Sequence, residues 1–154
     1  MSFGVYNVFK RNNCTDFQGK EESELLIMIV ENNAEDMRKL QSFVAQCYCD
    51  SDIITFTNSS EALNFIRSGK FSVDLCFTEV VMPEVSGFKL VTELREYNKQ
   101  SKAVFISDTA EYAVEAWRYH VTDYLLKPVT LENVTHTLES CFPCNSGYGL
   151  AESG

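Results

Sequence analysis

The stretch DLCFTEVVMPEVSG, residues 74–87, decides how the chain folds. Its apolar first half is typical of a buried strand, and that strand must end before Pro83, which has no N–H to donate to a sheet. Glu79 therefore stands at the carboxyl end of the strand. In open α/β sheets, ligands bind at this edge. The sequence thus predicts a functional carboxylate at position 79.

Working outward, apolar runs alternate with helical patterns along the chain. The predicted strands are residues 25–30, 52–56, 73–78, 102–107 and 123–126. The predicted helices follow Asn33, Ser60, Ser86, Asp108 and Thr130, which are good helix-capping residues. Strands that alternate with helices favour right-handed crossovers and a parallel sheet covered on both faces. The expected fold class is α/β, a doubly wound (βα)5 domain with a five-stranded parallel sheet.

The chain has 154 residues, the length of one ordinary domain. Periodic patterns cover residues 23–141, which we predict to be the folded domain. Residues 1–22 and 142–154 lack periodicity and are rich in Asn, Ser and Gly. We expect the first to be a flexible leader and the second a tail or linker.

The formal net charge of −9 argues against nucleic acid or an anionic membrane as a direct partner. No apolar run approaches the roughly 20 residues of a membrane helix. The N-terminal residues also lack the continuous apolar stretch of a signal peptide. We therefore expect a cytoplasmic protein.

Polar side chains end four of the five predicted strands. In chain order they are Glu31 with Asn32, Glu79, Ser107, and Lys127 just before a proline. Because parallel strands end at the same edge, these groups should meet there. One polar residue at a strand end would carry no information, but four such ends together indicate a site.

Several ordered motifs resemble the receiver domain of bacterial response regulators, especially receivers of the LytTR type. They are IMIVENN (27–33), the opening stretch 74–87, VFISDTAEYAVEAW (104–117) and TDYLLKP (122–128). The resemblance implies a flavodoxin-like fold with strand order 2-1-3-4-5. It places Glu79 at the phospho-acceptor position and Glu31 with Asn32 at the acidic pair that helps to hold Mg²⁺. It places Ser107 and Tyr124 at the switch positions and Lys127 at the family's lysine.

Two departures from the family pattern bear on function. Receivers usually carry aspartate where this chain has the longer Glu79, and two acidic residues where it has Glu31 and Asn32. The pocket charge is then −2 from Glu31 and Glu79, where the usual pattern gives −3. Mg²⁺ demands near-ideal oxygen geometry, so we expect no resident metal, or weak binding at Glu31 and Glu79. A displacement of about 1 Å can cost in-line phosphoryl transfer roughly 100-fold. Normal phosphorylation should therefore be impaired.

Two hypotheses follow for the altered site. In one, Glu79 imitates a phosphorylated aspartate and engages Ser107, so that Tyr124 turns inward. In the other, Glu79 and Lys127 form a static salt bridge that switches nothing. Both describe an atypical receiver, without enzymatic turnover, in a two-component system. The alternative is a genuine phospho-acceptor with a weak Mg²⁺-dependent site, which could be a fragment of a DNA-binding transcriptional regulator. A hydrolase using the paired glutamates is disfavoured, because it leaves Lys127 unexplained.

The resemblance implies a sensor histidine kinase or another signalling protein as partner. It also implies a homodimer through the fourth helix, the fifth strand and the fifth helix. On the fourth helix, the apolar spacing predicts that Trp117 is core, while Tyr112 and Tyr119 share a face that could be exposed. Exposed aromatic residues are enriched at interfaces. We therefore predict these two tyrosines as the interaction face.

Four cysteines form a second candidate site. Cys47 and Cys49 end the first helix, and Cys141 and Cys144 end the last. If those helices run parallel on one face of the sheet, the thiols could converge to bind zinc or form a redox-sensitive link. The competing interpretation, which we prefer, is that Cys47 and Cys141 are core residues on apolar stripes.

Overall fold

The computed structural model describes residues 7–10, 25–48 and 51–143. Five parallel strands form the body of the sheet, and their order agrees with the predicted 2-1-3-4-5. These strands are β2 (Leu26–Val30), β3 (Asp52–Phe56), β4 (Leu75–Glu79), β5 (Lys102–Ser107) and β6 (Asp123–Leu126). The predicted α/β doubly wound class is therefore confirmed.

A sixth strand, β1 (Asn7–Lys10), was not predicted. It pairs antiparallel with β3, with Asn7 opposite Thr55 and Lys10 opposite Asp52, and it forms one edge of the sheet. Four residues of the predicted leader, 7–10, therefore pair with the sheet, and the leader otherwise stays a prediction. An edge strand this short is held by backbone pairing on one side, so it leaves no periodic signal in the sequence.

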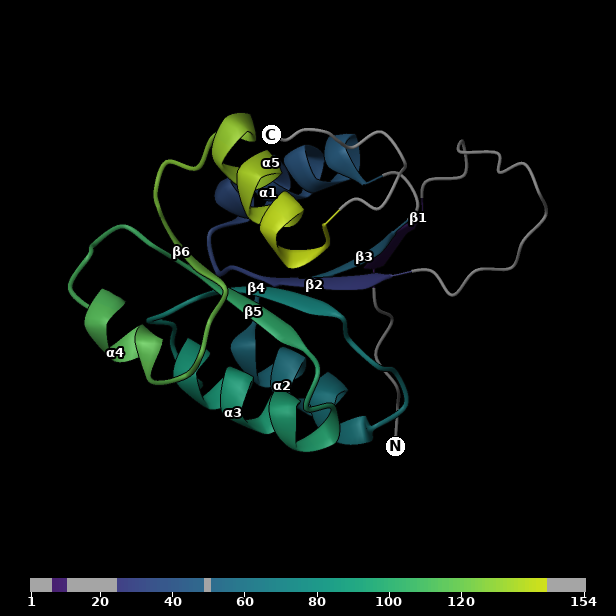
Figure 1. Ribbon diagram of the computed structural model, residues 1–154. Helices are drawn as coiled ribbons and strands as arrows, with labels where there is room; N and C mark the ends of the chain where they lie inside the picture. Colours follow the sequence, from purple (N-terminus) through teal and green to yellow (C-terminus); the bar gives the residue numbers. More distant parts are fainter. Residues whose placement is uncertain (1–6, 11–24, 49–50, 144–154) are drawn as a thin grey trace.

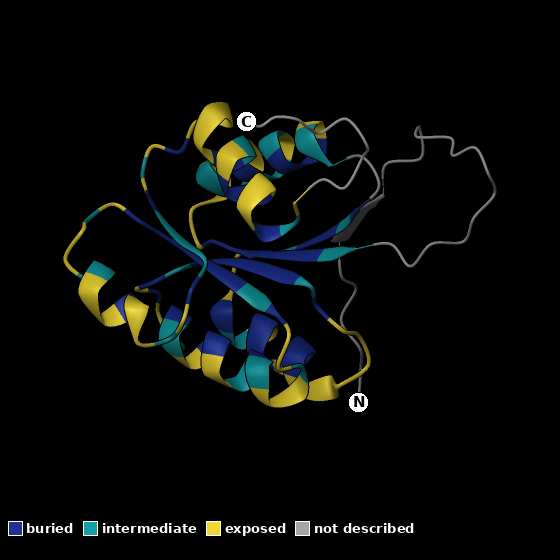
Figure 2. Cartoon of the chain, viewed as in Figure 1, coloured by how far each residue is buried: buried dark blue, intermediate teal, exposed yellow. Residues whose placement is uncertain are grey.

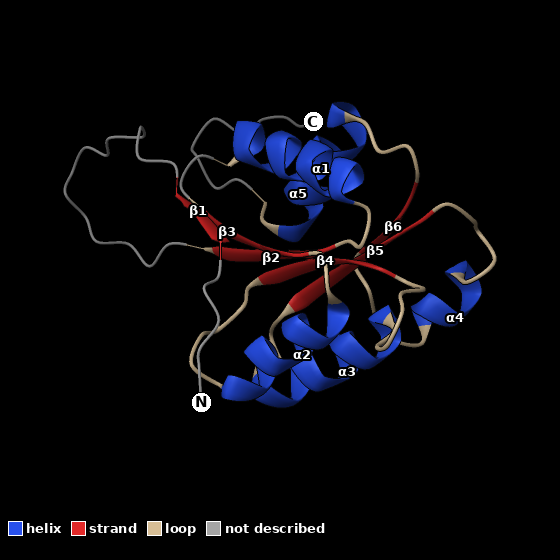
Figure 3. Cartoon of the chain, turned by 180° about the vertical axis from the view of Figure 1, so that it is seen from behind, coloured by secondary structure: helices blue, strands red, loops and turns tan. Residues whose placement is uncertain are grey.

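Helices cover both faces of the sheet. They are α1 (Ala34–Cys47), α2 (Ser59–Ser68), α3 (Gly87–Tyr97), α4 (Ala113–Trp117) and α5 (Leu131–Cys141). Helices α1 and α5 lie side by side on one face, and α2 and α3 lie on the other (Figures 1 and 3). None of the helices in the described ranges is both long and apolar enough to cross a bilayer.

The helix ends follow local rules. The side chains of Asn33, Ser86 and Thr130 each accept a hydrogen bond from the backbone N–H three residues on, as N-caps do. Helix α2 ends at Gly69, whose φ of 64° is the left-handed conformation that favours glycine. Its N-cap, however, is Asn58 rather than the predicted Ser60, which lies inside the helix.

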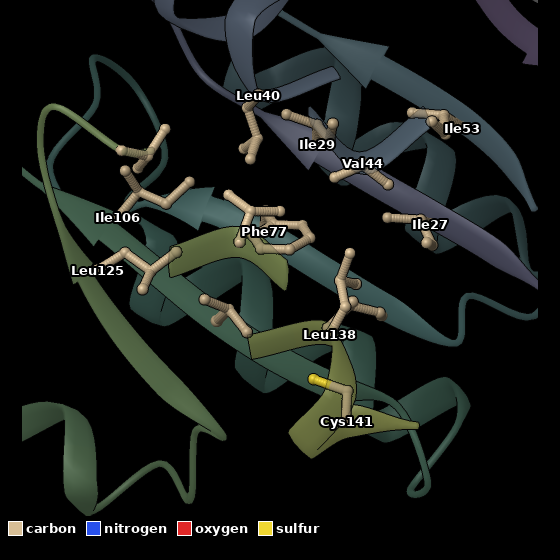
Figure 4. Packing of buried hydrophobic residues seen from close by; sticks show 14 of the residues in the cluster. Ile27, Ile29, Leu40, Val44, Ile53, Phe77, Ile106, Leu125, Leu138 and Cys141 are labelled. Atoms are coloured by element: carbon tan, nitrogen blue, oxygen red, sulfur yellow. The ribbon is translucent and has the colours of Figure 1, made fainter. Parts of the chain in front are cut away.

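The core lies between the sheet and the two helix layers, and buried residues line both faces of the central strands (Figure 2). Figure 4 shows the cluster under α1 and α5, where Leu40, Val44 and Leu138 pack against Phe77 and the neighbouring strands. Tyr97 and Leu131, which lie at helical spacing from the buried residues of α3 and α5, are nevertheless exposed. Both lie at a helix end, where the stripe has turned away from the sheet.

Helix α4 differs most from its prediction. It begins at Ala113 rather than after Asp108, and Trp117 is 69% exposed, so the prediction that Trp117 is core is wrong. The buried stripe is instead formed by Tyr112, Ala116 and Tyr119, which pack toward α3. The stripe that contains Trp117 and the stripe that contains Tyr112 and Tyr119 have equivalent helical spacing. Only contact with the rest of the fold determines which of the two faces inward.

Candidate functional site at the carboxyl ends of the strands

The ammonium group of Lys127 is the centre of an ion cluster at the carboxyl edge of the sheet. Its Nζ lies 3.0 Å from Glu79 Oε1, 3.1 Å from Glu31 Oε1 and 3.1 Å from Asp36 Oδ2. A hydrogen bond of 3.2 Å also joins Nζ to Glu31 Oε2. Three carboxylates from three separate elements therefore hold one cation.

The backbone places each member of the cluster. Glu79 is the last residue of β4, and the backbone N–H of Glu31 donates to Phe56 O at 3.0 Å, just past the end of β2. The N–H of Lys127 donates to Ser107 O at 2.8 Å, which aligns it with the end of β5. After Glu79 the chain folds back so tightly that a Cβ on Gly87 would overlap the carbonyl oxygen of Glu79. Glycine is therefore required at position 87.

Burial controls the protonation of the cluster. Glu31 is only 1% exposed, and this desolvation, together with the adjacent Glu79 carboxyl, raises the pKa of Glu31 to about 7. Burial also opposes the charge on Lys127, but hydrogen bonds to Glu79, Asp36 and Glu31 outweigh it and raise the pKa of Lys127. One ammonium cannot balance three ionised carboxylates, so the raised pKa of Glu31 means that this carboxyl retains a proton more readily than an isolated one does.

Sequence reasoning missed Asp36, and the predicted role of Asn32 stays a prediction. Asn32 is exposed, and among the described residues its side chain takes no part in the ion cluster. Asp36, in the first turn of α1, supplies the third carboxylate instead. The predicted pocket of two carboxylates therefore contains three. The sequence signal that could have indicated Asp36 is the acidic first turn of α1, because this helix begins at the same edge of the sheet.

The predicted switch residues form a neighbouring but separate network. The backbone N–H of Thr109 donates to Ser107 Oγ at 3.1 Å, and the hydroxyl of Tyr124 donates to Thr109 O at 2.7 Å. Ser107 is buried and Tyr124 is half-buried. Within the described part of the chain, no hydrogen bond joins Ser107 to Glu79, which bonds to Lys127.

The predicted interaction residues Tyr112 and Tyr119 are half-buried rather than exposed. Their rings contact Phe88 of α3, at centroid distances of 6.4 Å and 4.7 Å. The side chains that α4 exposes are Val114, at 77%, and Trp117. The prediction of an exposed tyrosine face is therefore corrected, because Phe88 offers those rings an apolar contact.

Of the four cysteines in the predicted cluster, Cys49 and Cys144 lie outside the described residues, so only Cys47 and Cys141 can be placed in the structure. Cys141 is buried in the core cluster, and burial raises the pKa of its thiol to about 11. Cys47 is half-buried, and its Sγ lies 3.2 Å from Thr135 Oγ1. Both positions fit the packing role, and the metal or redox role stays a prediction.

Known proteins share this architecture. The sequence profile of the response regulator receiver domain matches residues 27–139, so the chain belongs to this family of two-component signalling modules. The chain is 29% identical over 101 residues to the transcriptional regulatory protein NatR of Bacillus subtilis, covering 65% of this chain and 42% of NatR. It is 27% identical over 114 residues to the transcriptional regulatory protein YpdB of Escherichia coli, covering 73% of this chain and 46% of YpdB. It thus spans less than half the length of either relative.

Solved structures confirm the fold. The response regulatory domain of mrkE from Klebsiella pneumoniae superposes with a TM-score of 0.66 at 23% identity, covering 76% of this chain and 94% of that one. The match to a CheX–CheY–BeF3–Mg²⁺ complex from Borrelia burgdorferi has a TM-score of 0.67 at 17% identity, covering 77% and 89%. Receiver domains are signalling modules that interact with kinases and other signalling proteins, and they are generally not enzymes.

Proposed function

We propose that this chain is an atypical receiver, with Glu79 at the phospho-acceptor position, that signals through protein contacts without phosphoryl transfer. The observation that carries the proposal is the 3.0 Å ion pair between Glu79 and Lys127 within a cluster of three carboxylates. Lys127 binds one oxygen of this carboxylate, and the extra methylene of glutamate shifts the other from the aspartate position, which disfavours in-line attack on a phosphoryl group.

Of the two atypical mechanisms, the contacts favour the static pair over the phosphoryl mimic. A mimic requires Glu79 to engage Ser107, whereas the Ser107 hydroxyl accepts from Thr109 and Glu79 is held by Lys127. A single carboxylate also has less charge than a phosphoryl group, which adds about −1.5 to −2. If Glu79 and Lys127 form a static pair, the hydrogen bonds among Ser107, Thr109 and Tyr124 would keep one arrangement and would not switch.

Phosphorylation with a small donor tests this proposal. The wild type and Glu79→Asp are incubated with acetyl phosphate and Mg²⁺, and intact mass is measured over time. We expect no phosphoryl adduct on the wild type, with Glu79→Gln as the negative control. Robust labelling of the wild type that is lost in Glu79→Gln would contradict the proposal. It would favour the alternative, a weak but genuine phospho-acceptor.

We also propose a second copy of this chain as a partner, docking on the face formed by α4, β6 and α5. Strand β6 is the edge strand opposite β1 and runs between α5 and α4 (Figures 1 and 3). The large apolar side chains exposed on these elements and their flanks are Val114, Trp117, Leu126 and Leu131. Large apolar side chains exposed on adjoining elements support an association surface here.

Sedimentation velocity tests the dimer. A double substitution, Val114→Ser with Trp117→Ser, should weaken self-association. Phe71→Ser, which changes an exposed aromatic residue on a different surface, should not. A wild type that stays monomeric at high concentration would exclude this face as a self-association site. The chain spans less than half the length of NatR and YpdB. The alternative is therefore that this receiver is part of a longer transcriptional regulator.

A further inference from the structure

A groove between strand β6 and helix α5 lies apart from the ion cluster. It encloses about 460 Å³ and is lined by Asp123, Tyr124, Leu125, Leu126, Glu132, Asn133 and His136. Leu126 is 48% exposed, and the lining residues from α5 are exposed as well. Apolar side chains with a few polar groups among them are the usual lining of a binding groove. The groove is therefore open to another molecule.

The two carboxylates of the groove have no cation beside them. Asp123 is held by neutral donors, because its Oδ1 accepts from the backbone N–H of Tyr124 at 2.8 Å and its Oδ2 accepts from Thr137 Oγ1 at 2.6 Å. Glu132 is exposed, and neither it nor Asp123 forms a salt bridge with any residue that the structure describes. The groove therefore favours an occupant with a positive charge.

The end of helix α4 carries an aromatic and a cationic side chain that match this groove. Trp117 is the only tryptophan of the chain, and it is 69% exposed. Arg118 follows it, is also exposed, and has no carboxylate partner within the described ranges. Tryptophan and arginine are enriched among the residues that contribute most to binding at protein interfaces. The chain thus presents both the groove and a side-chain pair suited to fill it.

Symmetry can bring these two surfaces together between copies. Strand β6 runs between α4 and α5 (Figures 1 and 3), and a two-fold axis along β6 would set α4 of each copy against α5 of the other. We infer that Trp117 and Arg118 of one copy dock into the β6–α5 groove of a second copy. Trp117 packs against Leu126, and Arg118 pairs with Glu132. This inference rests on the proposed self-association face and deepens it by naming the residues that bind.

The two parts of the contact have different physical roles. The formal net charge of −9 opposes the association of two copies. Two crossed contacts between Arg118 and Glu132 place opposite charges together, which fixes the mutual orientation more than it adds affinity. Burial of Trp117 supplies the affinity, because an aromatic side chain of this kind buries about 150–250 Å². Each part can therefore be tested separately.

Fluorescence of the full chain tests the burial of Trp117 directly, because this residue is the only tryptophan. As concentration rises, the wild-type emission should shift to shorter wavelength and acrylamide quenching should fall, in step with the dimer fraction from sedimentation velocity. Phe71→Ser, on a different surface, should show the same changes. Dimerisation with unchanged emission and quenching overturns the inference and leaves the proposed self-association in place.

Charge reversal tests the pairing of Arg118 with Glu132. Arg118→Glu and Glu132→Lys each place like charges together twice in a homodimer, so each should weaken self-association at least roughly tenfold. An equimolar mixture of the two variants restores both opposite-charge contacts in a heterodimer and should associate about as tightly as the wild type. Lys99→Glu and Glu61→Lys form the control pair and should change nothing, alone or mixed. All four positions are exposed, so the variants should fold.

The outcomes separate this inference from the proposals on which it rests. Recovery of association in the mixture supports the inference. Single variants that associate like the wild type, or a mixture that does not recover, overturn the pairing of Arg118 with Glu132. A wild type that stays monomeric at high concentration overturns both the inference and the proposed self-association. None of these results depends on phosphoryl transfer, which is measured separately by intact mass.

Discussion

The carboxyl edge of the sheet and helix α4 are two regions of one small domain built in opposite ways. At the edge, charged side chains from β2, α1, β4 and the β6–α5 loop are mutually paired. At α4, a helix of five residues directs Val114 and Trp117 toward solvent. The side chains of the first region are paired with one another, whereas the second leaves apolar side chains exposed.

Hydrogen bonds to backbone carbonyls hold α4 against the rest of the domain. The guanidinium of Arg95 donates to the carbonyl oxygens of Tyr119 and His120, which follow α4, and to that of Ser101. At the other end, Tyr124 holds the Thr109 carbonyl. Backbone carbonyls, rather than charged pairs, anchor this helix. The ion pairs at the sheet edge are therefore gathered around Lys127, whereas α4 is held by hydrogen bonds at its two ends.

Removing the charge of Lys127 should lower the free energy of unfolding more than any other change proposed for these two regions. Without divalent metal, Lys127→Met leaves the buried Glu31 beside two other carboxylates. Breaking a buried pair in this way typically costs about 3–5 kcal/mol. Urea denaturation at about pH 8 measures the loss, and Lys39→Met serves as control. A loss no larger than that of the control would mean that the edge is no more tightly held than the surface.

The pH dependence of stability should be the next largest effect. The pKa of Glu31 is raised from 4.5 to about 7, so its contribution to stability is full below about pH 4.5 and is lost as pH rises through 7. Relative to Glu31→Gln, the wild type should lose on the order of 2–3 kcal/mol between those limits. Denaturation midpoints across this range check the sign. A constant difference between the two proteins would show that Glu31 is ionised throughout.

Arg95→Met should loosen α4 without touching the edge. Loss of hydrogen bonds from a charged donor to three carbonyls should cost about 2 kcal/mol. Amide hydrogen exchange should then become faster at Tyr119 and His120, whose N–H groups close the last turns after α4. Arg118→Met, an exposed neighbour, is the matched control. Equal exchange in both variants would place the anchor of α4 elsewhere.

The smallest effects should separate the two faces of α4. Tyr119→Ala removes a ring that contacts Phe88 and should cost about 1–2 kcal/mol. Trp117→Ala removes an exposed ring and should change stability by no more than about 0.5 kcal/mol. Guanidinium denaturation of both variants compares them directly. The reverse order would restore Trp117 to the core and the tyrosines to the surface.

Most of the fold could be predicted because it depends on local patterns. Apolar runs bounded by polar residues located the five parallel strands to within two residues at each end. The meeting of Glu79 with Lys127 followed from the geometry of parallel strands. Strand β1 could not be found in this way, because a strand of four residues that pairs on one side only leaves no periodic signal.

The remaining details depend on how helices are rotated about their own axes. Both Glu35 and Asp36 lie in the first turn of α1, and the packing of Leu40 and Val44 against the sheet determines which of them faces Lys127. In α4, the contact with Phe88 selects the tyrosine stripe over the one that contains Trp117. Helical spacing alone describes both choices equally well.

By itself, the sequence determined the class of fold, the edge that carries the site and the carboxylate at position 79, since these follow from periodicity and chain order. Only the tertiary structure decided that Asp36 joins the ion cluster around Lys127 and that Trp117 faces solvent. The physical reason is that a side chain's partners depend on the orientation of whole elements. That orientation is a property of long-range packing rather than of any local stretch.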